Sequence, residues 1–280
     1  MLILVLFYIM YLVAWKIYQN NDKAFKITTI IVLCCLSSYL HAQYGTKSGD
    51  WPSYGGDTGS TKYSPLNQIT VENFEQLEVA WTWTSIDADL DLEAIQEIND
   101  AVRINNFQGT PLKVGNKLFI ITALNQIAAI NPTSGETIWS FNPEVYLAGT
   151  PVNYIGYHHR GLAYWSDGDE ERVLAGLNDG FLISIDAKTG VPDAQFSGGK
   201  IDLTIGLPRA TRDVLDWTGA QPVAVVSPPI VVGDIVITSS ITQARPINRE
   251  RPPMWVRGYN IRTGEHVWDF HTIPLAGEYG

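Results

Sequence analysis

The sequence predicts an all-β fold, and within that class a β-propeller, from a repeated segment and two hairpin signals. The repeated segment has an apolar strand, an Asn or Asp, two further residues, a Thr or Ser, a Gly, and a second run that ends in an aromatic residue. It occurs three times, at residues 128–141, 183–196 and 258–270. The hairpin signals are Gly-Asn and Gly-Asp turns flanked by alternating apolar residues, within residues 110–122 and 227–240.

The chemistry of the repeated turn explains its residue types. An Asn or Asp side chain can close an Asx turn, and the glycine supplies the positive φ that tightens the hairpin. The aromatic residue is expected to pack between neighbouring sheets. The Asx residues are Asn131, Asp186 and Asn260, the glycines are Gly135, Gly190 and Gly264, and the aromatic residues are Trp139, Phe196 and Trp268.

Residues 77–84, Leu-Glu-Val-Ala-Trp-Thr-Trp-Thr, look like a further copy of the tryptophan strand without its partner strands. Such a strand can complete the last blade of a propeller and close the ring. Residues 50–280 hold about three and a half units, whereas propellers have about four to eight blades. We therefore expect residues 43–280 to be a partial propeller from a truncated chain. The acidic stretch 85–104 has apolar residues at helical spacings and predicts a short surface helix.

The first 42 residues are predicted to be a targeting region. Two apolar runs, 1–15 and 27–40, are each shorter than the ~20 residues of a membrane-spanning helix. The second run follows two lysines and leads to Ala42, which is typical of a cleaved secretory signal peptide. The alternative is an anchor in the inner membrane, which would give the protein a membrane association. The protein is therefore expected to be periplasmic or secreted, or anchored with its propeller facing the periplasm.

Composition restricts the class of partner and the source of stability. The formal net charge is −10, which argues against nucleic acid or anionic lipid as the main partner. Hydrophobic residues make up 45% of the chain, so a sizeable core is possible. Both cysteines, Cys34 and Cys35, lie in the leader. The exported part therefore has neither a disulfide nor a thiolate metal site, and its stability must come from packing.

Four motifs, in order along residues 50–280, resemble a known family. They are DWPSYGGDTGSTKYSPLNQIT (50–70), RGLAYW (160–165), SPPIVVGDIVITSS (227–240) and VRGYNIRTGEHVWDFHTIP (256–274). Together they are similar to the amino-terminal half of the pyrroloquinoline-quinone (PQQ)-dependent quinoprotein dehydrogenases, and especially to the glucose-dehydrogenase-like branch. The resemblance implies an eight-bladed propeller, with about half of the blades present here.

The resemblance also implies the chemistry. The family consists of exported enzymes that oxidise sugars or other alcohols with PQQ, held near the ring axis beside a divalent cation, usually Ca²⁺. The cation polarises the quinone carbonyl as a Lewis acid. Electrons then pass to ubiquinone or to a cytochrome. An aldose or another polyol-like alcohol is the expected substrate, because Tyr154 and Ile155 stand where alcohol-oxidising members carry a vicinal cysteine pair.

Five residues correspond to site positions of the family. Arg160, in RGLAYW, stands where an arginine pairs with a carboxylate of the quinone, and a planar guanidinium suits that partner. The other cofactor-binding candidates are Gln108, Ser240 and Thr242. Gln243 stands where members often have an acidic cation ligand, and its neutral amide is a weaker ligand for Ca²⁺. The family's base aspartate belongs to later blades, so no catalytic residue is assigned.

Two alternatives stay open. One is a non-catalytic periplasmic propeller that scaffolds other proteins, binding peptides at a sheet edge or loop face. The other is a quinoprotein pseudoenzyme, which the neutral Gln108 and Gln243 would permit. Next to Arg160, His158 and His159 are expected to alternate across a strand, so that at most one of them faces inward. Either is more simply a structural histidine than a metal ligand.

Overall fold

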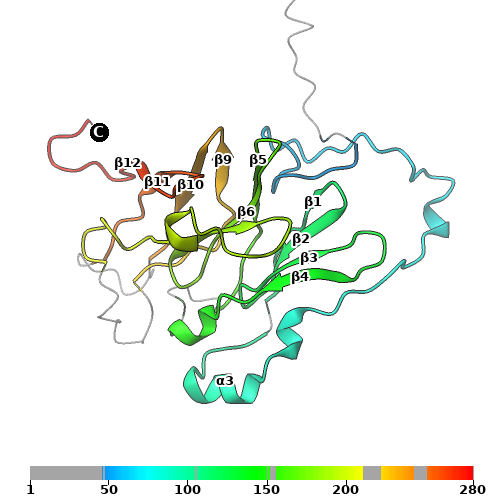
Figure 1. The fold of residues 1–280 in the computed structure, drawn as a ribbon, viewed down its shortest axis with the longest axis horizontal. Helices are drawn as coiled ribbons and strands as arrows, with labels where there is room; N and C mark the ends of the chain where they lie inside the picture. Colours follow the sequence, from blue (N-terminus) through cyan, green and yellow to red (C-terminus); the bar gives the residue numbers. More distant parts are fainter. Residues whose placement is uncertain are drawn as a thin grey trace, which may run out of the picture. The chain divides into compact units, whose positions relative to one another are not determined.

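Three four-stranded antiparallel sheets make up the described part of the chain (Figure 1). The structure is a computed structural model that describes residues 46, 48–104, 106–149, 151, 156–210, 222–242 and 251–279. Within each sheet the strands follow one another in chain order, as in a propeller blade. The architecture thus confirms the predicted all-β propeller, of which part is present here.

The strands of the first sheet are β1 (Leu112–Val114), β2 (Lys117–Ile121), β3 (Ile127–Ile130) and β4 (Thr137–Phe141). Those of the second are β5 (Ala163–Ser166), β6 (Glu171–Gly176), β7 (Phe181–Asp186) and β8 (Lys200–Asp202). Those of the third are β9 (Ile230–Val232), β10 (Ile235–Ser239), β11 (Val256–Asn260) and β12 (His266–Phe270). One α-helix, α3 (Leu92–Ile98), and four short 3₁₀ helices are also described: η1 (Phe74–Gln76), η2 (Ile86–Asp89), η3 (Val145–Ala148) and η4 (Ser197–Gly199).

The predicted helical stretch is confirmed as two short helices, η2 and α3. Asp91 caps α3, because its side chain accepts a hydrogen bond from the Ala94 backbone N–H at 3.1 Å. Asp87 of η2 is fully buried and accepts hydrogen bonds from Thr122 Oγ1, at 2.7 Å, and from Gln126 Nε2, at 2.8 Å. A buried carboxylate needs such donors. Asp87 therefore ties η2 to the connection between β2 and β3.

The three predicted Asx turns form as expected. In each, the Asx side-chain oxygen accepts a backbone N–H three residues on, from Ser134, Thr189 and Thr263 respectively, at 3.3, 2.7 and 3.0 Å. The following glycines have φ values of +76°, +78° and +74° for Gly135, Gly190 and Gly264. Only glycine adopts this left-handed region at little cost. The repeat therefore encodes the same Asx-glycine turn in each sheet.

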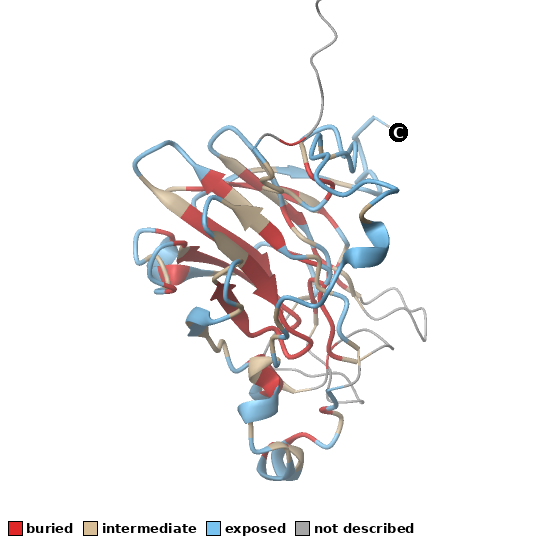
Figure 2. Ribbon diagram, turned by 90° about the vertical axis from the view of Figure 1, so that its right-hand side faces the viewer, coloured by how far each residue is buried: buried red, intermediate tan, exposed pale blue. Residues whose placement is uncertain are grey.

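Alternation along the strands places apolar residues on both faces of the central strands. In β3, Ile127 and Ala129 join the core between the first and second sheets, whereas Ala128 and Ile130 pack toward Trp81 and Trp83. Figure 2 shows buried residues gathered along the strands and exposed residues on the turns. A second core lies between the second and third sheets, and its largest side chains are Trp165, Phe196, Trp255 and Tyr259. Each pair of neighbouring sheets therefore shares a hydrophobic core.

Trp139 packs between neighbouring sheets as the sequence predicts, and it does so by contacting the repeated turn of the second sheet. A Cβ built on Gly190 would lie 2.7 Å from the ring of Trp139, and the Nε1–H of Trp139 donates to the carbonyl of Ala187 at 3.2 Å. We call this the tryptophan contact between the first and second sheets. Trp81, in the orphan segment 77–84, repeats it on Gly135 and donates to Pro132 O at 3.1 Å. Residues 77–84 therefore place Trp81 as the repeat places Trp139, although they do not form a β-strand in the structure.

The second and third sheets meet differently. Phe196 is buried in the core between the second and third sheets, which confirms the prediction for the aromatic residue of the repeat. It precedes η4 and does not end a strand, and it is not the side chain that a Cβ on Gly264 would meet. Ser197 lies there instead, its Oγ 2.6 Å from the position of a Cβ on Gly264. The carbonyl of Ile261, equivalent to that of Ala187, accepts a hydrogen bond from Arg172 Nη1. An arginine thus takes over the donor role of the tryptophan.

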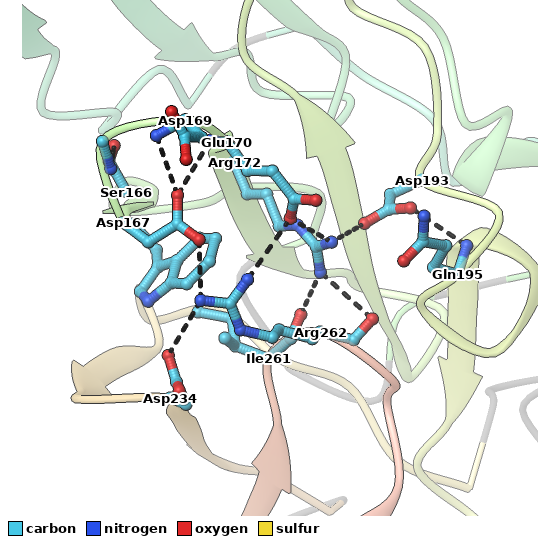
Figure 3. A network of polar contacts seen from close by, with 12 residues as sticks. Ser166, Asp167, Asp169, Glu170, Arg172, Asp193, Gln195, Asp234, Ile261 and Arg262 are labelled. Atoms are coloured by element: carbon cyan, nitrogen blue, oxygen red, sulfur yellow. Dashed lines mark hydrogen bonds and ion pairs between the residues drawn. The ribbon is translucent and has the colours of Figure 1, made fainter.

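Arg172 belongs to a cluster of charged residues, which we call the arginine cluster: Asp167, Glu170, Arg172, Asp193, Asp234 and Arg262 (Figure 3). Arg172, 4% exposed, pairs with Asp193 at 2.7 Å and with Glu170 at 3.0 Å. Arg262 pairs with Asp167 at 2.7 Å. Both guanidinium groups lie over Trp165, with Cζ 5.4 and 4.6 Å from the ring centroid. The hairpin tip 167–170 thus takes part in packing between sheets.

Among the described residues, no helix is both long enough and apolar enough to cross a membrane. The predicted leader, residues 1–42, lies outside the described residues, as does most of the connection 207–222.

Candidate functional site

The predicted cofactor-binding segments meet at one end of the three sheets. This is the end at which β1, β5 and β9 begin and β10 finishes. The Arg160 N–H donates to Val226 O at 3.0 Å, and the Thr110 N–H donates to Arg160 O at 2.9 Å. Farther along, Ala224 and Ile241 exchange two backbone hydrogen bonds, at 2.9 and 2.7 Å. The chain segments that carry the candidates are therefore joined by main-chain bonds.

Arg160 is exposed at this end. Among the described residues, its guanidinium makes one side-chain hydrogen bond, from Nη1 to Ser227 Oγ at 3.4 Å. Its backbone is held on both sides, toward Thr110 and toward Val226. A guanidinium has five N–H donors in a planar fork that matches a carboxylate. Arg160 can therefore receive an anionic group without first breaking an ion pair within the described structure.

The glycine after Arg160 is required by the backbone. Gly161 has a φ of +154°, and a Cβ there would lie 3.3 Å from the carbonyl oxygen of Thr110. Thr110 and Gly161 form an isolated parallel bridge. A side chain at residue 161 would push the two segments apart. The Arg-Gly pair of the motif thus combines an exposed cation with a close backbone contact.

The other candidates occupy different environments. Gln108 is exposed, and its amide donates to Asn106 Oδ1 at 2.7 Å. Ser240 is buried directly after β10, and half-buried Thr242 donates from Oγ1 to Pro222 O at 3.3 Å. Gln243 lies outside the described residues, as do Tyr154 and Ile155. The roles of all these residues in binding a cofactor or metal stay predictions.

Both histidines before Arg160 are buried, with exposures of 1% for His158 and 0% for His159, so the expectation that only one faces inward was wrong. Strand β5 begins only at Ala163, and the chain before it does not alternate as a strand would. Burial lowers the pKa of His159 to about 4. His159 is therefore neutral near pH 7. Its Nε2 lies 2.6 Å from Gly176 O, and its Nδ1 accepts the Gly161 N–H at 3.1 Å.

Sequence reasoning missed two buried asparagines that connect the sheets near Arg160. The Asn178 side chain bonds the main chain of His158 through both of its polar atoms, at 3.1 Å each, and donates to Val225 O at 2.8 Å. The Asn178 N–H donates to Asn125 Oδ1 at 2.8 Å. A Leu-Asn pair after the second strand of a sheet, at 124–125 and 177–178, was the signal that could have revealed them.

The Arg160 guanidinium suits an anionic, carboxylate-bearing ligand such as PQQ, because among the described residues its side chain makes a single hydrogen bond, to Ser227. A metal site finds less support. Among the described residues, no group of three or more His, Cys, Asp or Glu side chains could hold a metal ion. The predicted ligand, Gln243, is outside the described ranges. The geometry therefore fits the quinone, and the cation stays a prediction.

Comparison with protein families gives a match over nearly all of the sheet region. Residues 51–279 match the model described as the β-propeller domain of PQQ-type glucose, ethanol and alcohol dehydrogenases. The chain is 32% identical to quinoprotein glucose dehydrogenase A of Acinetobacter calcoaceticus over 248 residues, covering 81% of this chain and 28% of that protein. It is 29% identical to the glycerol dehydrogenase large subunit of Gluconobacter thailandicus, covering 82% and 30%.

Solved structures agree on the fold. The quinohemoprotein alcohol dehydrogenase from Comamonas testosteroni superposes with a TM-score of 0.58 at 21% identity, covering 85% of this chain and 29% of that one. A europium-containing methanol dehydrogenase gives a TM-score of 0.55 at 21% identity, covering 80% and 32%. The present chain thus spans under a third of the length of these relatives.

Proposed function

Because the chain belongs to the PQQ β-propeller family of glucose, ethanol and alcohol dehydrogenases, we propose that the protein is a PQQ-dependent dehydrogenase of an aldose sugar or another alcohol. The observation that carries the proposal is Arg160. The family motif predicts a cofactor-binding arginine, and this arginine is exposed where the inner segments of three sheets meet. When bound, PQQ supplies the two-electron acceptor for the alcohol.

In that proposal, the residues of this chain bind the quinone and orient it. Arg160 pairs with a quinone carboxylate through two N–H groups of its fork. Gly161 lets the segments of Thr110 and Arg160 lie in contact, which fixes the backbone position from which the Arg160 side chain extends. Ser240 and Thr242 follow β10, and Ile241 between them bonds Ala224 in the segment that also bonds Arg160, which supports a role for both residues beside the quinone.

The finer assignments rest on likeness. A sugar or polyol substrate is supported by the similarity to a quinoprotein glucose dehydrogenase and to glycerol dehydrogenase large subunits, and by the absence of a vicinal cysteine pair before Arg160. Ca²⁺ beside the quinone, ubiquinone or a cytochrome as electron acceptor, and a periplasmic or secreted location complete the proposal.

The test uses the full-length protein. It is loaded with PQQ and Ca²⁺, and the reduction of an artificial dye acceptor is followed with a panel of aldoses, polyols and simple alcohols. We expect quinone-dependent dye reduction with at least one aldose or polyol, and none in the protein without PQQ. Quinone binding without turnover on any substrate would support the pseudoenzyme alternative. Absence of both binding and turnover would contradict the proposal.

A further inference from the structure

We propose that His159 is a positioning residue for Arg160: its neutral imidazole holds the Arg160–Gly161 turn from beneath, so that the guanidinium stands ready for the quinone carboxylate. The inference rests on the proposed function, because the carboxylate is that of PQQ. It adds a residue that touches neither quinone nor substrate and acts through its neighbour.

The two contacts of His159 join the residue after Arg160 to a strand of the second sheet. Its Nδ1 accepts the N–H of Gly161, the residue after Arg160, at 3.1 Å. Its Nε2 donates to the carbonyl of Gly176, the last residue of β6, at 2.6 Å. The imidazole thus links the turn to a central strand of the second sheet. Because His159 has no solvent exposure, neither contact can be exchanged for water at low cost.

The tautomer follows from these partners. A backbone N–H can only donate, so Nδ1 must carry a lone pair, and a carbonyl can only accept, so Nε2 must carry the proton. Only the neutral ring with its proton on Nε2 satisfies both. A charged ring would direct a second N–H at the Gly161 N–H, one residue from the Arg160 cation. The arrangement therefore requires the neutral ring.

Two substitutions separate the two contacts. The side-chain oxygen of Asn lies close to where Nδ1 of His lies, so His159→Asn keeps the acceptor for Gly161 and loses the donor to Gly176. Gln reaches as far as Nε2, so His159→Gln keeps the donor to Gly176 and loses the acceptor for Gly161. Each variant loses one buried hydrogen bond, and similar losses of stability are expected. Only the Gln variant releases the turn beside Arg160.

The experiment measures PQQ binding to the natural full-length protein by quenching of tryptophan fluorescence, together with the thermal midpoint of each variant. We expect His159→Gln to weaken quinone binding about tenfold and His159→Asn to stay within about threefold of wild type, at similar thermal midpoints. A purely structural role would weaken binding equally in both. Equal affinities for the two variants would overturn the inference.

Hydrogen exchange of the Gly161 amide, measured without quinone, distinguishes this inference from the proposed function. The amide should exchange slowly in wild type and in His159→Asn, and at least about tenfold faster in His159→Gln. If wild type binds no PQQ, the proposed function fails, and the exchange pattern still decides whether His159 orders the turn. Equal exchange in all three proteins would contradict the role of His159.

Discussion

The two interfaces between neighbouring sheets bond the same main-chain carbonyl of the repeated turn with different side chains. Between the first and second sheets, Trp139 lies on Gly190 and donates to the carbonyl of Ala187. Between the second and third, Arg172 donates to the equivalent carbonyl of Ile261. The first contact is mostly apolar area with one hydrogen bond. The second is a buried cation that depends on surrounding carboxylates. One backbone turn can therefore be joined to its neighbour by either means.

The difference predicts how each interface fails. Removing part of an apolar contact lowers the free energy of unfolding roughly in proportion to the buried apolar area that is lost. Removing one member of a buried charged network leaves its partners unsatisfied, which costs more than the network contributes. The arginine cluster should therefore be the more sensitive interface to single substitutions, and the only one of the two that responds to acid.

The largest expected effect is that of Arg172→Ala. It leaves Asp193 without its ion-pair partner and the carbonyls of Ile261 and Arg262 without their buried donor, and we expect a loss of about 3–5 kcal/mol in the free energy of unfolding. Lys188→Ala is the matched control, because Lys188 is half exposed and lies 3.9 Å from Glu171. It should cost under about 1 kcal/mol. Denaturant unfolding of both variants measures these losses. Equal losses would show that the buried ion pairs of Arg172 stabilise the fold no more than an exposed pair does.

An intermediate effect separates the two turns. Gly190→Ala and Gly264→Ala introduce the same strain, because φ is +78° and +74°, and that strain costs about 1–2 kcal/mol. The new Cβ of residue 190 would meet the rigid Trp139 ring, whereas that of residue 264 would first meet the small Ser197 hydroxyl. We expect Gly190→Ala to cost about 1–3 kcal/mol more. Thermal unfolding of both variants measures the difference. A larger loss of stability for Gly264→Ala would show that the Ser197 contact is the less tolerant of the two.

The smallest effect is a dependence on acid. Backbone hydrogen bonds, above all from Glu170, together with Arg262 lower the pKa of Asp167 to about 2, below its value of about 3.9 in unfolded chains. Its stabilising contribution is therefore present above about pH 4 and is lost as the pH falls toward 2. Asp167→Asn should be less stable than wild type at pH 5, and the difference should shrink with falling pH. A constant difference from pH 5 to pH 2.5 would exclude Asp167 as the acid-sensitive member.

The packing of Trp139 between the first and second sheets could be predicted from the sequence, and the arginine cluster could not. Asx, glycine and aromatic residues recur in register, so the turn and the aromatic residue that packs between sheets are visible as a pattern. Arg172 lies in β6, and its partners include the main-chain carbonyls of Ile261 and Arg262, a kind of partner that every residue offers. Asp167 and Glu170 fit a solvated hairpin tip equally well until the third sheet places Arg262 beside them.

The candidate site likewise combines features that a sequence pattern reveals with features that depend on residues distant in sequence. Arg160 could be predicted only through the family motif, because its surroundings come from three sheets distant in sequence. The burial of His159 was missed, because alternation applies only within a regular strand and the chain before Gly161 is not one. The recurring Leu-Asn pair could have marked Asn178, but not its partners, because the main chains of His158 and Val225 that it bonds are distant from it in sequence.

The affinity of Arg160 variants for PQQ tests the central claim most directly. Arg160→Lys should bind PQQ about tenfold more weakly, because an ammonium lacks the planar fork, and Arg160→Glu at least about 100-fold more weakly. Arg103→Glu is the control, since Arg103 is also exposed and bonds only nearby carbonyls among the described residues. It should bind PQQ as wild type does. If Arg160→Glu binds PQQ within about twofold of wild type, Arg160 does not hold the quinone and the account is wrong.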